Sequence, residues 1–167
     1  MSKSEVDPWL VLRTRSRHEN AVENVLLQKC ITAYLPKYKV VRSTNGRKRV
    51  TEMPLFPGYV FVRPRIDQYE GMRYIRGSCG LVLADSRPAR LPETELQAVK
   101  TLVDSGVPLT VDQMLVSGKR VKITAGPFAG VEGELVLMKD REVLSINVDM
   151  VGSSVRVEVD RDLVVPL

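Results

Sequence analysis

The sequence of 167 residues predicts an α+β protein built from two domains. Before residue 105, strand-like runs rich in β-branched and aromatic residues alternate with two long segments of helical periodicity. After it, short β-branched runs follow one another with turn residues between them. We therefore expect an α+β sandwich at residues 1–104, a linker at 105–116 and a small β-barrel at 117–167.

The first domain is expected to begin with a strand and a helix. Residues 9–14 (WLVLRT) form a short apolar run that suits a buried strand. In the segment that follows, residues 15–30, the apolar side chains of Val22, Val25 and Leu26 fall on one helical face. The pattern therefore predicts a strand followed by a helix.

A basic hairpin is expected next. Residues 31–41 (ITAYLPKYKVV) return to β-branched and aromatic types, with Pro36 at an edge or bend. Asn45 and Gly46 form a typical two-residue hairpin turn between strand-like segments. Basic side chains crowd this turn: Arg42, Arg47, Lys48 and Arg49.

Further strands and helices complete the first domain. Residues 59–62 are strongly strand-like, 67–76 (DQYEGMRYIR) predict a short helix, and 80–84 (GLVLA) predict another buried strand. Residues 92–105 begin with Pro92 at a first-turn position and predict a longer helix. Its apolar stripe consists of Leu96, Val99, Leu102 and Val103. Two helices packed over one face of a sheet fit a ferredoxin-like sandwich.

The second domain is expected to be all β. The segment before it contains Gly106, Pro108 and Gly118 and has no clear periodicity, as is typical of a linker. The β-runs that follow are RVKIT, GVEGELVLM, EVLSINVDM, VRVEV and DLVVPL. Their period of two and their valine and isoleucine content favour a small closed barrel.

The charge of the two parts differs. Residues 1–112 carry 18 basic and 12 acidic side chains, a net charge of +6, whereas residues 113–167 carry 7 and 8, a net charge of −1. A basic domain favours a polyanion as partner, and a nearly neutral one favours a protein.

Several classes of function lack the residues they need. Cys30 and Cys79 stand alone and His18 is the single histidine, so neither a zinc finger nor a disulfide framework is expected, and both thiols are expected in the core. The first residues lack the apolar segment of a signal peptide, and no run approaches the roughly 18 apolar residues of a membrane span. His18 and Glu19 have no accompanying nucleophile or phosphate-binding loop. We expect a cytoplasmic, non-enzymatic protein without metal, cofactor or membrane contact.

Two motifs, in this order, resemble those of a known family. GPFAGVEGEL at residues 126–135 resembles the KOW motif of small SH3-like barrels in transcription elongation factors and some ribosomal proteins. With LFPGYVFV at residues 55–62, it makes nearly the whole chain similar to the NusG family of transcription elongation factors. The resemblance implies an N-terminal NGN domain that binds the clamp helices of the RNA polymerase β′ subunit and bridges the DNA cleft toward the β subunit. It also implies a tethered KOW barrel that recruits other factors, and a monomer.

Within the family, the compact charged hairpin resembles the specialised paralogs, such as RfaH and the UpxY-type antiterminators. Residues 149–153 lack the phenylalanine that termination-competent members typically carry before the glycine, which argues against contact with Rho. The resemblance favours a factor that suppresses pausing and termination on specific operons. The alternative is a general NusG factor that couples polymerase to Rho and the ribosome. A ribosomal KOW protein would carry its basic charge on the barrel, contrary to the charge counts.

The resemblance assigns roles to three groups of residues. The polymerase-docking group is Trp9, Leu55, Phe56, Pro57 and Tyr59, for which ordinary core packing is the alternative. The group expected at the non-template DNA strand is Arg13, Arg15, Arg17, His18, Arg73, Tyr74 and Arg76, for which a solvated charge run is the alternative. The KOW partner group is Phe128, Met150 and Val151, with ribosomal protein S10 as the implied partner and closure of the barrel core as the alternative.

Two further expectations concern the hairpin and the barrel. The hairpin either touches upstream DNA or is a soluble tip. RfaH can refold its KOW domain into helices, but the β-branched run Val155, Val157 and Val159 favours the barrel here.

Overall fold

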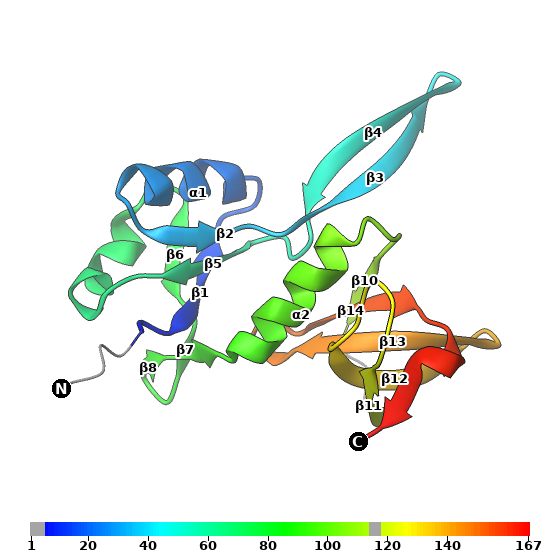
Figure 1. The fold of residues 1–167 in the computed structure, drawn as a ribbon. Helices are drawn as coiled ribbons and strands as arrows, with labels where there is room; N and C mark the ends of the chain where they lie inside the picture. The colour runs from blue at the N-terminus through cyan, green and yellow to red at the C-terminus, as the bar shows by residue number, and fades with distance from the viewer. Residues whose placement is uncertain (1–5, 114–117) are drawn as a thin grey trace. The chain divides into compact units, whose positions relative to one another are not determined.

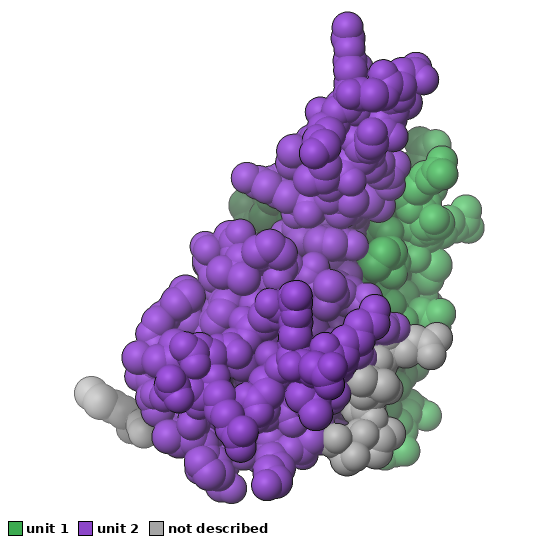
Figure 2. Space-filling view, turned by 90° about the vertical axis from the view of Figure 1, so that its right-hand side faces the viewer, with its two compact units in different colours: residues 1–35, 56–93 green, residues 36–55, 94–167 purple. Residues whose placement is uncertain are grey.

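The computed structural model describes residues 6–113 and 118–167 (Figure 1), and it divides into two compact units (Figure 2). Unit 1 comprises Met1–Leu35 and Phe56–Glu93, and unit 2 comprises Pro36–Leu55 and Thr94–Leu167. Both helices and strands are present, as predicted.

Unit 1 is built on an antiparallel sheet with the strand order β2-β5-β1-β6, in which β9 also pairs with β1. The strands are β1 (Trp9–Thr14), β2 (Thr32–Tyr34), β5 (Tyr59–Arg63), β6 (Ser78–Leu81) and β9 (Arg90–Leu91). Helix α1 (Glu19–Gln28) follows β1 directly, so the predicted strand and helix are confirmed.

The core of unit 1 forms because β1 and β5 are nearly continuous apolar runs and apolar residues recur on one face of the helix. Leu10 and Leu12 of β1 are buried together with Val22 and Leu26 of α1. Val25, which the helical pattern also placed on this face, packs against the cluster. The strand β5 contributes Val60 and Val62.

Two predicted elements of unit 1 differ in the structure. The short helix predicted at residues 67–76 consists of two 3-10 segments, Ile66–Gln68 and Glu70–Tyr74. The strand predicted at residues 80–84 is divided between β6 and β7 (Leu83–Ala84), and β7 pairs with β8 (Arg87–Pro88) in a separate small hairpin. Leu83 is therefore exposed rather than buried.

The prediction that both cysteines lie in the core is wrong, because Cys30 and Cys79 are exposed. Cys30 follows the end of α1 with a left-handed φ of 57°, a conformation typical of helix ends rather than of core packing. Cys79 lies on β6, the last strand in the order of this sheet.

In unit 2, the predicted hairpin is confirmed. Strand β3 (Lys37–Thr44) pairs with β4 (Arg47–Pro54) along its whole length. Asn45 and Gly46 between them have φ values of 53° and 74°, as a tight two-residue hairpin turn requires. The predicted longer helix is α2 (Glu93–Asp104), in which Leu96, Val99 and Leu102 are buried.

Unit 2 also contains a sheet with the order β10-β14-β13-β12-β11-β15. Its strands are β10 (Thr110–Gln113), β11 (Lys119–Ile123), β12 (Glu132–Met138), β13 (Arg141–Val148), β14 (Ser153–Glu158) and β15 (Val164–Pro166). The five predicted β-runs are all present. Strand β10, which lies in the segment expected as a linker, adds to this sheet by pairing with β14.

Candidate nucleic-acid and polymerase interface

The loop between β1 and α1 presents arginines to solvent. Arg15 and Arg17 are exposed, and Arg17 has a left-handed φ of 65°. The Arg15 N–H donates to the Gly77 carbonyl at 2.8 Å, and the His18 Nδ1 lies 2.9 Å from the Ser16 carbonyl oxygen. The backbone of the loop is thus held in place, while the exposed side chains of Arg15 and Arg17 can reach an anion in solvent.

A second exposed segment carries Arg73, Tyr74 and Arg76. The Tyr74 side chain is 72% exposed. The Arg73 guanidinium lies 4.9 Å from the centre of the Tyr74 ring, and its Nη2 donates to the Tyr74 hydroxyl at 2.9 Å. Arg73 also lies 3.7 Å from Glu70 in an exposed ion pair. Tyr74 is therefore an exposed aromatic side chain that is held by its contacts with Arg73.

The structure brings these two segments together. Gly77 lies so close to the loop that a Cβ at this position would fall 2.8 Å from the His18 Cβ. Arg73 lies over Gly80 of β6, and Gly80 pairs with Arg13 of β1. We call the resulting surface the arginine patch and define it as Arg13, Arg15, Arg17, Arg73, Tyr74 and Arg76, all of which are exposed.

The residues expected to dock on polymerase are mostly buried. Trp9, Leu55 and Phe56 are 6%, 1% and 3% exposed. The Arg63 guanidinium lies 5.6 Å from the centre of the Trp9 ring, and the Phe56 ring lies 5.9 Å from that of Phe61.

Of the same group, Pro57 is exposed and Tyr59 is half-buried. Any contact through this motif in the present conformation therefore starts at Pro57 and Tyr59.

Gly58 joins the docking motif to the arginine loop. The Thr14 N–H donates to the Gly58 carbonyl at 2.8 Å, and the Gly58 N–H donates to Glu19 Oε1 at 2.9 Å. Thr14 and Glu19 flank the Arg15–His18 loop, so one glycine holds both of its ends. Sequence reasoning considered Glu19 only beside His18, because nothing in the local pattern shows a contact across 39 positions of the chain.

The KOW partner group lies at the ends of strands in the six-stranded sheet. Phe128 and Val151 are buried and Met150 is half-buried. An apolar pocket beside Phe128 is lined by Ile123, Ala125, Pro127, Glu158, Val159, Asp160 and Leu163. Because Val151 is buried and Met150 is half-buried, the turn that carries them offers little apolar surface to a partner.

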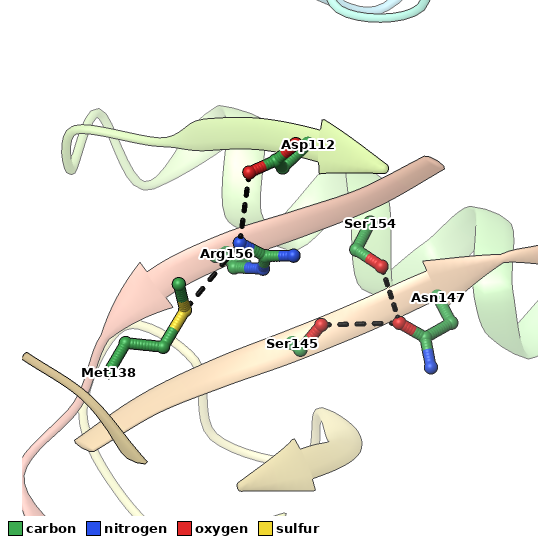
Figure 3. A network of polar contacts seen from close by, with 6 residues as sticks. All are labelled: Asp112, Met138, Ser145, Asn147, Ser154 and Arg156. Carbon is green, nitrogen blue, oxygen red and sulfur yellow. Dashed lines mark hydrogen bonds and ion pairs between the residues drawn. The ribbon is translucent and has the colours of Figure 1, made fainter. Parts of the chain in front are cut away.

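The strands that flank this turn carry a polar network (Figure 3). Asn147 Oδ1 accepts from the Ser154 hydroxyl at 2.6 Å and from the Ser145 hydroxyl at 3.2 Å. On β14, the buried Arg156 lies 3.4 Å from Asp112 of β10. The network ties β10, β13 and β14 to one another.

Residues 6–113 and 118–167 lack two further features, a metal-binding cluster and a membrane-spanning helix. Within these ranges, no group of three or more histidine, cysteine, aspartate or glutamate side chains is arranged to hold a metal ion. None of the helices there is both long and apolar enough to cross a membrane.

A sequence model of a known family matches most of the domain that carries the arginine patch. This model, described as the transcription termination factor nusG, matches residues 7–100. The chain belongs to the NusG family. Membership makes it a transcription termination/antitermination factor rather than an enzyme.

Relatives of the same name match over nearly the whole chain. The NusG protein of Lactococcus lactis is 29% identical, over 91% of this chain and 89% of its own length. That of Streptococcus pyogenes is 30% identical, over 91% of this chain and 92% of its own. Both are named transcription termination/antitermination proteins.

A solved structure supports the fold. The structure described as domain interaction in Thermotoga maritima NusG covers 96% of this chain and 97% of its own, with a TM-score of 0.54 and 23% identity. The NusG-like mixed α and β fold and the NGN domain are thereby confirmed.

Proposed function

We propose that this NusG-family protein is an elongation and antitermination factor that docks on the β′ clamp helices of RNA polymerase and holds the non-template DNA strand. The observation that carries the proposal is the arginine patch, in which two neighbouring segments carry five exposed arginines and an exposed tyrosine. The mechanism is binding, without a chemical step.

The arginine patch suits a single strand of DNA. Arginines neutralise phosphates, and an accessible aromatic ring stacks on an unpaired base of any sequence at about 1–3 kcal/mol per base. The Arg73–Tyr74 contact holds the ring in one orientation, which lowers the entropy lost when a base stacks on it. A transcription bubble supplies unpaired bases and closely spaced phosphates together.

Docking on polymerase is proposed to use the turn at Pro57 and Tyr59. These side chains retain accessible surface, whereas Trp9, Leu55 and Phe56 support the turn from the core. An exposed proline and a half-buried tyrosine fit the apolar face of a coiled coil better than charged residues would. Strong docking through the buried members requires a rearrangement that exposes them.

The specialised role on particular operons is the finer part of the proposal. It rests on the turn Asp149–Ser153, where Val151 stands in place of the expected aromatic residue and is 8% exposed. A turn without an exposed aromatic side chain gives Rho little to bind. Ribosomal protein S10 remains the proposed partner of the KOW domain.

A general NusG factor is the second candidate. It is favoured by the names of the relatives, which are termination/antitermination proteins rather than operon-specific factors. In that case the protein also recruits Rho.

The basic hairpin has two proposed roles, contact with upstream DNA or a soluble tip. Every residue from Val41 to Glu52 is exposed. Arg42 and Arg49 lie directly opposite each other, and like charges in this position repel. A bound polyanion would relieve this repulsion, which favours the DNA contact.

Single-round transcription across a Rho-dependent terminator tests the proposal, with the cognate polymerase, Rho and its housekeeping NusG present. The proposed factor increases read-through, and the double variant Arg15→Glu/Arg17→Glu loses the increase. Lys119→Glu/Lys122→Glu, which reverses two exposed charges on β11, is the matched control and keeps it. Increased termination would instead identify the general factor, and identical read-through with and without the protein would refute polymerase docking.

A further inference from the structure

Glu19 is a buried carboxylate that lies between the two proposed binding segments. It occupies the first position of α1 and is 5% exposed. A buried carboxylate is costly unless hydrogen bonds and local charge stabilise it. Two features do so: the Gly58 N–H at 2.9 Å and the N-terminal end of the α1 dipole.

The hydrogen bonds around Glu19 form a continuous chain through unit 1. Gly58 accepts from Thr14 on one side of the arginine loop and donates to Glu19 on the other. The first residue of the loop, Arg15, also donates its N–H to Gly77, the residue that follows Arg76. A shift of Gly58 therefore moves both ends of the loop.

Gly58 is also suited to transmit a movement of its neighbour Pro57. Its φ of 87° is strained for any residue with a side chain, so this position of the turn requires glycine. Pro57 has a fixed φ and cannot absorb a displacement by rotating about that bond. A displacement of Pro57 therefore moves the Gly58 peptide, and with it Thr14 and Glu19, which are hydrogen-bonded to that peptide.

We propose that Glu19 is a positioning residue that couples the Pro57–Gly58 turn to the arginine loop, so that docking of the turn fixes Arg15 and Arg17 for the DNA strand. This inference rests on the proposed function. It assigns Glu19 no direct contact with polymerase or DNA. The side chain acts through the Gly58 N–H.

The test compares Glu19→Met, which retains most of the volume and loses the acceptor, with Glu19→Gln, which retains both. Glu23→Met is the matched control, because Glu23 on the same helix accepts from the backbone of Leu35 at 3.1 Å, away from the arginine loop. Affinity is measured for polymerase alone and for polymerase on a DNA bubble. The dissociation constant for polymerase alone, divided by that for polymerase on the bubble, reports how much DNA contributes to binding.

The expected result is specific to Glu19. Glu19→Met lowers the ratio by about tenfold, the size of a typical coupling between neighbouring sites. Glu19→Gln and Glu23→Met leave the ratio near that of the unmodified protein. Hydrogen exchange of the Gly58 amide, measured without polymerase, becomes faster in Glu19→Met alone.

Different outcomes overturn the two proposals. If Glu19→Met and Glu23→Met change the ratio equally, or if Gly58 exchanges at its normal rate in Glu19→Met, the coupling role of Glu19 is refuted. If the unmodified protein does not bind polymerase, or binds it equally with and without the bubble, the proposed function fails. In that case the Gly58 exchange still shows whether Glu19 holds the turn.

Discussion

At the residue scale, Phe56 shows that a residue of the proposed docking motif can be buried. Its ring packs 5.9 Å from that of Phe61, and of the five residues in the docking group only Pro57 and Tyr59 are exposed or half-buried. Phe56 therefore contributes to the stability of the protein whether or not it ever contacts polymerase.

Replacement of Phe56 by alanine is expected to destabilise the protein by about 3–5 kcal/mol, because it removes a buried ring and leaves a cavity. Urea unfolding followed by circular dichroism measures the change. Pro57→Ala is the control, since Pro57 is exposed and its replacement is expected to cost at most about 1 kcal/mol, through the entropy of the unfolded chain. A loss below about 1 kcal/mol for Phe56→Ala would show that this ring is not core.

A second residue-scale prediction concerns Glu95 of α2. Burial, and to a smaller extent the negative charge of Asp149, raises the pKa of the Glu95 carboxyl, while Arg120 partly offsets the effect. The folded state thus binds this proton more tightly than the unfolded state, and the stability of the protein falls as the pH rises through the window between the two pKa values.

Glu95→Gln removes the loss of stability that ionisation of the Glu95 carboxyl causes as the pH rises. The variant is expected to be more stable than the unmodified protein at pH 7, with the difference shrinking as the pH falls toward the unfolded-state pKa. Urea unfolding at a series of pH values measures the effect. An advantage that is the same at every pH would contradict the raised pKa of Glu95.

At the scale of elements, strand pairing and an ion pair hold β10 to the six-stranded sheet of unit 2. Thr110–Gln113 pairs with β14, and Asp112 lies 3.4 Å from the Arg156 side chain, which is 4% exposed (Figure 3). A buried charge that loses its partner is costly, whereas replacement of the whole pair by apolar groups is often neutral.

Asp112→Ala is therefore expected to cost about 1–3 kcal/mol, less than a fully buried pair because Asp112 itself is 65% exposed. Asp112→Ala/Arg156→Met is expected to recover part of this loss. Urea unfolding gives the stabilities, and hydrogen exchange shows whether the β10 amides open first. Equal stability of Asp112→Ala and the unmodified protein would mean that strand pairing alone holds β10.

At the scale of the whole molecule, the net positive charge is concentrated in the part of the chain that carries the arginine patch and the hairpin. Each phosphate contact made by an arginine releases counterions, so the affinity for a DNA-containing complex falls with salt.

The double variant Arg15→Glu/Arg17→Glu is expected to reduce the slope of log affinity against log salt by about 1–2, at about 0.7 for each lost contact with a single strand. Titration of the polymerase and bubble complex between low and moderate salt measures it. The β11 control Lys119→Glu/Lys122→Glu keeps the original slope. An unchanged slope in the arginine variant would place the DNA elsewhere on the protein.

The amino-acid sequence by itself determined the elements whose cause is local. The Asn45–Gly46 turn, the strands β1 and β5, the apolar stripe of α2 and the β-runs of the C-terminal sheet each depend on neighbouring residues, and all are found. The LFPGYVFV and GPFAGVEGEL motifs also indicated the family correctly, since a motif is a local pattern.

Tertiary structure alone decided which side chains are covered and which distant segments meet. Burial depends on what packs over a residue, so the core position of Phe56 and the exposure of both cysteines could not be read from their neighbours in sequence. The arginine patch and the bond from Gly58 to Glu19 join residues far apart in the chain, and only the folding of the sheet brings them within reach.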